Sequence, residues 1–180
     1  TLTAEPARRL ARASRARREH PFAFVLDSSE PMVTGVLDLI VVEEDGASLI
    51  VDYKSDRLPD GAESPGTEEL ERLVERDYSI QRLLYALAAI EDGVERVEVA
   101  HWFLERPGAW VSARFVASER SHLRERLLSR IAAARAKGFE VTKSPHRGLC
   151  LTCPGRGNLC SWGEERTMAE PSPSQNPDDR

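Results

Sequence analysis

Two aspartates and one lysine stand out among the residues that could do chemistry. Asp38 interrupts a run of Val, Leu and Ile, and Asp52 is followed two positions later by Lys54. An ionised carboxylate inside an apolar run is costly to bury unless a cation or several hydrogen-bond donors compensate its charge. Side chains two apart on a strand share one face, so Asp52 and Lys54 are expected to point the same way.

The chemistry that these residues could support is metal-assisted hydrolysis. Two carboxylates suit Mg²⁺ or Mn²⁺, which keep water molecules and complete their coordination with substrate phosphate. A metal-bound water has a lowered pKa and can act as the nucleophile. Lys54 could orient that water or stabilise the charge that grows on the phosphate. The alternative is a structural ion pair between Lys54 and either Asp38 or Asp52.

The elements that must position these residues follow from the hydrophobic pattern. The pattern predicts a buried strand over 32–42 and an antiparallel strand over 48–53, joined by a turn at Asp45-Gly46. It also predicts a helix over 1–18, a strand over 22–26, an exposed loop over 57–69, a helix over 71–91, strands over 94–104 and 110–116, and a helix over 118–137. This order of elements predicts an α/β fold.

Length and composition restrict the class of protein. A chain of 180 residues with 41% hydrophobic content can build one core, and a net charge of -5 argues against a protein that simply coats nucleic acid. Arg8, Arg12 and Arg15, in an arginine-rich N-terminal segment, are predicted to contact DNA, with a solvated helix face as the alternative. No stretch is apolar enough to cross a membrane, so a cytoplasmic protein is expected, and the start at Thr1 suggests a piece of a longer polypeptide.

Three clustered cysteines suggest a metal or cluster site. Cys150, Cys153 and Cys160 lie close together, a pattern more typical of metal binding than of a disulfide framework. His146 could complete a zinc site, whereas a [4Fe-4S] cluster needs four thiolates and only three are present. The polar segment 164–180, rich in Pro and Ser, is predicted to be a disordered tail.

The acidic residues resemble the catalytic core of the PD-(D/E)XK nuclease superfamily, with Asp38 as the first acid and Asp52-Tyr53-Lys54 as the second acid and lysine. Three further features are similar to the RecB-like branch of that superfamily: the motif Tyr78-x-x-Gln81-x-x-x-Tyr85, the segment Glu19-His20-Pro21-Phe22, and the cysteine cluster. The resemblance covers roughly residues 19–160.

The resemblance implies a restriction-endonuclease-like core, with a mixed central β-sheet flanked by helices, in a domain over 1–163 that ends in a cysteine-cluster segment over 146–163. It implies catalytic roles for Gln81 and Tyr85 beside the acids and lysine. The implied metal ligands are Asp38, Asp52, Tyr53 and Glu19, with His20 as the weaker alternative to Glu19. For the cysteines it implies a [4Fe-4S] cluster whose fourth ligand lies outside this chain; zinc is the second interpretation and free thiols the third.

The implied function is metal-dependent hydrolysis of DNA, as an exonuclease rather than an endonuclease. Such domains end helicase-nucleases of the AddA/AddB kind, which process double-strand breaks in repair and recombination. A helicase portion, on the same polypeptide or on a partner protein, would deliver single-stranded DNA. The alternatives are a CRISPR-adaptation nuclease, whose short chain carries the fourth cysteine, and a non-catalytic DNA-binding scaffold. A nucleotide-dependent motor is excluded for these residues because no phosphate-binding loop is present.

Overall fold

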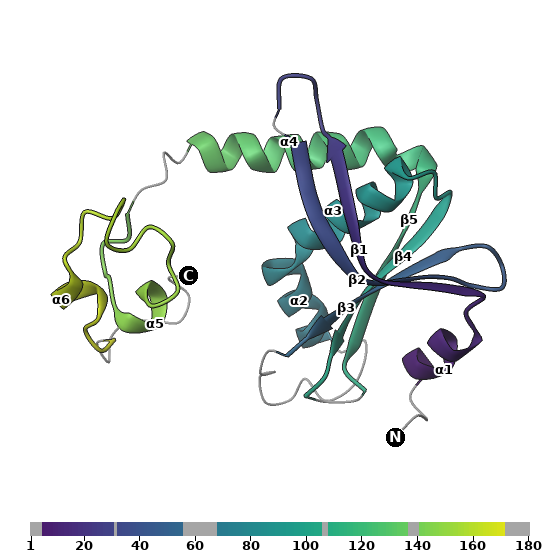
Figure 1. The fold of residues 1–180 in the computed structure, drawn as a ribbon, viewed down its shortest axis with the longest axis horizontal. Coiled ribbons are helices and arrows are strands. Elements are labelled where there is room, and N and C mark those ends of the chain that lie inside the picture. Colours follow the sequence, from purple (N-terminus) through teal and green to yellow (C-terminus); the bar gives the residue numbers. More distant parts are fainter. Residues whose placement is uncertain (1–4, 31, 56–67, 106–107, 137–140, 172–180) are drawn as a thin grey trace. The chain divides into compact units, whose positions relative to one another are not determined.

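The computed structural model describes residues 5–30, 32–55, 68–105, 108–136 and 141–171. It contains two compact units, residues 1–131 and 132–180, which are described separately. The first unit is built on a five-stranded sheet (Figure 1) whose strands lie side by side in chain order. The strands are β1 (Arg15–Val25), β2 (Met32–Val42), β3 (Ser48–Lys54), β4 (Arg96–Phe103) and β5 (Trp110–Val116).

The sheet is mixed. β1, β2 and β3 pair antiparallel, β3 and β4 pair parallel, and β4 and β5 pair antiparallel. A parallel pair needs a crossover connection, and the helices between β3 and β4 supply it. The predicted mixed sheet with flanking helices is therefore confirmed.

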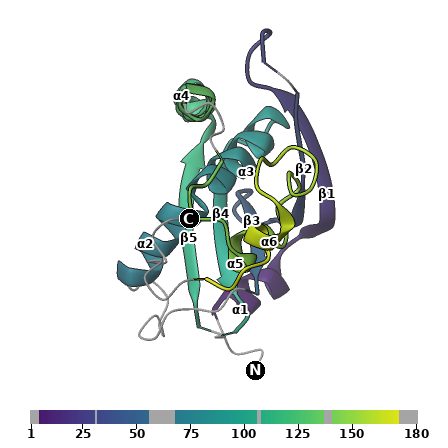
Figure 2. The same cartoon turned by 90° about the vertical axis from the view of Figure 1, so that its left-hand side faces the viewer.

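Helices cover both faces of the sheet (Figures 1 and 2). α2 (Glu68–Asp77) and α3 (Ser79–Glu91) connect β3 to β4, and α4 (Arg120–Ala136) follows β5. The main core joins side chains of α3 and α4 to one face of the strands. A short 3-10 turn, Ala117–Glu119, leads into α4. On the other face, Leu10 and Ala13, in and just after α1 (Glu5–Arg12), pack against a second core cluster. We call these the α3 face and the α1 face.

The predicted N-terminal helix over 1–18 is wrong in its second half. α1 ends at Arg12, and the chain enters β1 at Arg15 after Ser14 donates its backbone N–H to the Val42 carbonyl (2.9 Å). Arginine and alanine favour helix in isolation. Here the backbone partners offered by β2 outweigh that preference, so the strand predicted over 22–26 begins seven residues earlier.

The predicted helix over 71–91 is two helices that meet at Tyr78. This residue has φ -124° and ψ 4°, outside helical geometry, although its N–H still bonds to the Val74 carbonyl (2.9 Å). The departure turns α3 away from the direction of α2. Of the loop predicted over 57–69, residues 57–67 lie outside the described residues, and the last two belong to α2.

The second unit contains two short helices, α5 (Arg147–Cys150) and α6 (Glu164–Thr167). Because Thr167 is buried in α6, the prediction of disorder from residue 164 onward is wrong at its start; residues 172–180 lie outside the described residues. Trp162 donates its indole N–H to the Thr142 carbonyl (2.7 Å), which ties two segments of this unit together. Within the described part of the chain, no helix is long and apolar enough to span a membrane.

Candidate active site

Asp52 is the centre of a hydrogen-bonded group on the α3 face. It lies near the end of β3 and is only 3% exposed. Its Oδ1 accepts hydrogen bonds from Gln81 Nε2 (3.1 Å) and the Tyr85 hydroxyl (3.2 Å). Burial raises the pKa of Asp52; the adjacent Lys54 opposes that shift, and the charge of Asp38 adds to it. Two acids and one lysine therefore lie within electrostatic reach of one another.

Lys54 forms an ion pair with Asp52. Its Nζ lies 2.7 Å from Asp52 Oδ2, and both side chains are almost completely buried. Nζ also donates to Gln81 Oε1 (2.7 Å) and lies 4.1 Å from the centre of the Tyr78 ring. The ion pair between these two residues, which the sequence left open as an alternative to catalysis, is thus present. Among the described residues, this ion pair is the one polar contact of the buried Asp52 Oδ2.

Asp38 lies where β2 and β3 separate. A regular strand places alternate residues on one face, yet Leu37 and Ile40, three apart, both belong to the core of the α3 face. The alternation therefore shifts around Asp38, and the register of β2 with β3 ends before Asp38 and Asp52 could pair. The Tyr53 N–H donates instead to Asp38 Oδ2 (2.9 Å), which holds this carboxylate at the mouth of the gap.

Glu19, the predicted third metal ligand, lies on β1 directly opposite Asp38 on β2. The register passes from the pair Arg18 and Leu39 to the pair His20 and Leu37 and leaves Glu19 and Asp38 unpaired. Glu19 is exposed and has φ 46°, a left-handed conformation that is strained for a residue other than glycine. In the described ranges no three His, Cys, Asp or Glu side chains are arranged to hold a metal ion. A ligand role for Glu19 or His20 therefore stays a prediction.

Gln81 and Tyr85 point to the same place, as their spacing on a helix requires. Gln81 Nε2 donates a hydrogen bond to the Tyr85 hydroxyl (2.8 Å) and another to Asp52. Gln81, Tyr85 and Asp52 therefore form one hydrogen-bonded group. Burial raises the pKa of Tyr85 to about 12, with the charge of Asp52 as a further cause, so this hydroxyl is a hydrogen-bond donor at any physiological pH. The Phe22 ring packs edge-on against Tyr85, with ring centroids 6.0 Å apart.

One residue of this site, His101, was not predicted from the sequence. His101, the β4 register partner of Asp52, is completely buried, and neither ring nitrogen has a partner among the described residues. Burial, together with the charges of Lys54 and Arg82, lowers the pKa of His101 to about 3, so the ring is neutral. Its ring stacks on Tyr78 at 5.4 Å. A polar residue inside the apolar run 97–103 was the available signal, the same signal that identified Asp38.

A sequence profile described as the PD-(D/E)XK nuclease superfamily matches residues 1–160. The chain belongs to this superfamily. The match covers the whole of the first unit and agrees with the restriction-endonuclease-like fold expected from the resemblance.

Curated relatives of this PD-(D/E)XK domain are ATP-dependent helicase/nuclease subunits from Bacillus cereus and Bacillus thuringiensis subsp. konkukian. Each is 33% identical over 93 residues, which is 45% of this chain and 7% of the relative. The chain thus matches only a small part of their length, and the similarity agrees with the RecB-like branch. A solved structure described as "Crystal structure of SSO0001" is similar with a TM-score of 0.35 and 13% identity, over 63% of this chain and 50% of that one.

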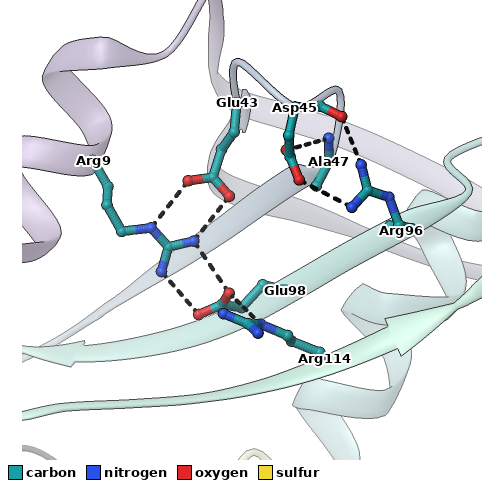
Figure 3. Close-up of polar contacts among 7 residues, drawn as sticks. All are labelled: Arg9, Glu43, Asp45, Ala47, Arg96, Glu98 and Arg114. Atoms are coloured by element: carbon teal, nitrogen blue, oxygen red, sulfur yellow. Dashed lines mark hydrogen bonds and ion pairs between the residues drawn. The ribbon is translucent and has the colours of Figure 1, made fainter.

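The arginines near the N-terminus of the nuclease domain divide into two groups. Arg8, Arg12 and Arg15 are exposed, the first two on α1 and the last at the start of β1. Arg9 lies between two acids (Figure 3): it donates to both carboxylate oxygens of Glu43 (3.0 and 2.8 Å) and to both of Glu98 (3.0 and 3.1 Å). Arg9 therefore holds α1 on the sheet, and DNA contact by the exposed group stays a prediction.

The cysteines lie in the second unit and are all free thiols. Cys150 is buried, Cys160 is half-buried and Cys153 is exposed. They are not arranged with one another or with His146 as a three-ligand metal group in the described residues. The Nδ1 atom of His146 is buried without a hydrogen-bond partner there.

Proposed function

We propose that this domain is a Mg²⁺- or Mn²⁺-dependent deoxyribonuclease whose active site is Asp38, Asp52, Lys54, Gln81 and Tyr85. The observation that carries the proposal is the buried carboxylate of Asp52. One of its oxygens accepts two hydrogen bonds, and the other contacts only the Lys54 ammonium among the described residues, with the charge of a second acid, Asp38, nearby. Membership of a nuclease superfamily supplies the reaction type.

The residues present fit a divalent cation. Asp52 Oδ2 is a buried oxygen whose charge is compensated, among the described residues, only by Lys54. Asp38 offers a second carboxylate, and the Tyr53 carbonyl faces the same gap, because the N–H and C=O of one strand residue point to the same side. Such oxygen ligands suit Mg²⁺ and Mn²⁺. A bound cation would lower the pKa of a water molecule and so supply the nucleophile.

The remaining side chains hold this group in place and neutralise charge. Gln81 bridges Lys54 and Asp52, accepting a hydrogen bond from the ammonium and donating one to the carboxylate. Tyr85 fixes Asp52 Oδ1, so Oδ2 keeps one orientation. Lys54 is then positioned to stabilise the charge that develops on the scissile phosphate.

The context of the proposed activity is a helicase-nuclease that processes double-strand breaks. The names of the curated relatives support association with a helicase, which would deliver single-stranded DNA from another part of the polypeptide or from a partner protein. Exposed Arg8, Arg12 and Arg15 are the proposed phosphate contacts, and release of counterions from phosphate would drive this binding. A non-catalytic scaffold is the second candidate, and it predicts binding without cutting.

The experiment that tests the activity compares cleavage of linear and circular single-stranded DNA with Mn²⁺. The wild type is expected to degrade the linear substrate and spare the circle, as an exonuclease does. Asp52→Asn should abolish cleavage and leave DNA binding unchanged, whereas Asp92→Asn, which removes the same charge at the exposed end of α3, should change neither cleavage nor binding. Wild-type protein that binds single strands and cuts none would favour the scaffold.

For the cysteines we propose a [4Fe-4S] cluster held by Cys150, Cys153 and Cys160 with a fourth ligand from outside this chain; zinc with His146 is the alternative. Three thiols within eleven residues and the unpartnered Nδ1 of His146 support a metal in this unit. Visible absorption of anaerobically purified protein, combined with metal analysis, distinguishes iron, zinc and free thiols in one measurement.

A further inference from the structure

The α1 face of the sheet carries three aromatic side chains that the proposed chemistry does not use. Tyr53, Trp102 and Trp110 are register partners on β3, β4 and β5, so they form one row on one face. We call these three residues the aromatic row. Consecutive ring centroids are 5.9 and 6.0 Å apart. The row begins at the same end of β3 as the candidate active site: the Tyr53 side chain lies on the face opposite that of Asp52, and its backbone N–H donates to Asp38.

α1 packs over the part of this face next to the aromatic row, and Trp102 and Trp110 pack against the same core cluster. Leu10 and Ala13 pack against a cluster formed by the two rows of residues next to the aromatic row. Arg9 bonds to Glu98, which belongs to the row farther from the aromatic row. Tyr53 is 39% exposed, and both tryptophans are half-buried. Aromatic rings thus remain accessible to solvent at the end of the sheet where the acids lie.

A cation lies beside the exposed end of the row. Arg18 is exposed, and its register partner on β2 is Leu39, which in turn pairs with Val51 on β3. Arg18 therefore lies on the α1 face, in the row next to that of Tyr53. Aromatic rings that accept bases, next to cations that follow the backbone, are the usual components of a site for single-stranded nucleic acid.

We propose that the aromatic row binds the bases of single-stranded DNA, with Arg18 on the backbone, and leads the strand to the acids. Every base has a flat face that stacks on an aromatic ring, so such binding tolerates any sequence. The ring spacing exceeds the roughly 3.4 Å per nucleotide of a duplex strand, so bases seated on neighbouring rings must be spread apart. A duplex, whose bases are stacked on one another, cannot present them. The proposal rests on the proposed function in taking DNA as the substrate.

Tryptophan fluorescence tests the proposal directly, since base stacking quenches the indole. The full chain should carry Trp162→Phe, so that Trp102 and Trp110, in the row, give the whole signal. With chelator present to prevent cleavage, oligothymidylate is expected to quench this signal to saturation. An abasic oligonucleotide of equal length should quench little and bind more weakly. Equal quenching and affinity for the two ligands would overturn the proposal, because phosphate contacts alone would then account for binding.

Variants separate stacking from packing. Tyr53→Leu should raise the Kd for oligothymidylate roughly tenfold and leave the Kd for the abasic ligand within about twofold, and Tyr53→Phe should restore wild-type binding. Val116→Ala is the matched control, since Val116 has the same exposed fraction of 39% on β5. A folded Tyr53→Leu protein with unchanged oligothymidylate binding would refute the proposal. If that variant fails to fold, the comparison of ligands on the Trp162→Phe protein decides alone.

The outcome is distinguishable from failure of the nuclease proposal. Cleavage with Mn²⁺ but no quenching in chelator would refute base binding by the aromatic row and support the nuclease proposal. Quenching without cleavage would support base binding by the row and refute the nuclease proposal. A row that iodide quenches but DNA does not is accessible in solution yet indifferent to bases. That result would overturn the proposal in favour of a surface for another protein segment.

Discussion

Replacing Glu98 with Gln is expected to lower the free energy of unfolding by about 3 kcal/mol at neutral pH. Glu98 lies on β4 with its side chain 8% exposed, and its carboxylate accepts hydrogen bonds from Arg9 and from Arg114 Nε (3.0 Å). Burial alone would raise its pKa, but the hydrogen bonds from Arg9, Ser112 and Arg114 lower it from 4.5 to about 2. At about 1.36 kcal/mol per pKa unit, this drop corresponds to roughly 3 kcal/mol.

The sign of the pH dependence follows from the lowered pKa. The stabilisation by Glu98 is present above pH 4.5, where the unfolded chain is ionised as well, and is lost as the pH falls towards 2. Urea unfolding of wild type and Glu98→Gln should therefore show a gap in the free energy of unfolding that is largest at neutral pH and narrows in acid. Glu68→Gln, which removes an exposed ion pair with Arg72 on α2, is the control and should cost under about 0.5 kcal/mol. A gap near zero at neutral pH, or one independent of pH, would refute the reasoning.

Three further predictions concern the candidate active site, and a fourth concerns the packing of Phe22. Lys54→Met should reduce cleavage about 10²- to 10³-fold with DNA affinity unchanged, as single-turnover and binding assays can check. In chelator, Asp52→Asn should be at least as stable as wild type at neutral pH, because burial raises the pKa of Asp52 and so disfavours its ionised form in the folded protein. The stabilisation by the protonated carboxyl is present below the usual pKa of 3.8 and is lost as the pH rises. Thermal midpoints of the two proteins should then converge in acid; a less stable variant would contradict this. Tyr85→Phe should cost about 1 kcal/mol in urea unfolding, because the hydrogen bond to Asp52 is lost. Gly35→Ala should cost about 1–3 kcal/mol, because the new Cβ would lie 2.5 Å from the Phe22 ring; unchanged stability would show that the ring moves freely.

The two acids of the candidate active site could be predicted because each breaks a local rule. A carboxylate in a strand of Val, Leu and Ile has no packing explanation, and the spacing of Asp52 and Lys54 fixed their shared face. The helix period likewise predicted that Gln81 and Tyr85 face one point, and both bond to Asp52. These inferences need only the geometry of a single strand or helix.

The rest depends on partners far away in the chain. Arg15 and its neighbours on β1 have helical preferences, and only the register with β2 places them in a strand. The break at Tyr78 has no glycine or proline to announce it, and its ring is fixed by contacts with His101 and Lys54. Tyr53 and Trp110 belong to one row only because β4, which carries Trp102, lies between their strands.

Mn²⁺ binding followed by electron paramagnetic resonance tests most directly whether Asp38 and Asp52 share one divalent cation. In a titration of the domain with Mn²⁺, the signal of the free ion should be suppressed by wild type and by Asp92→Asn. Asp38→Asn and Asp52→Asn should each lose this suppression while keeping wild-type circular dichroism. Equal binding of Mn²⁺ by all four proteins would contradict the assignment of the two acids as metal ligands.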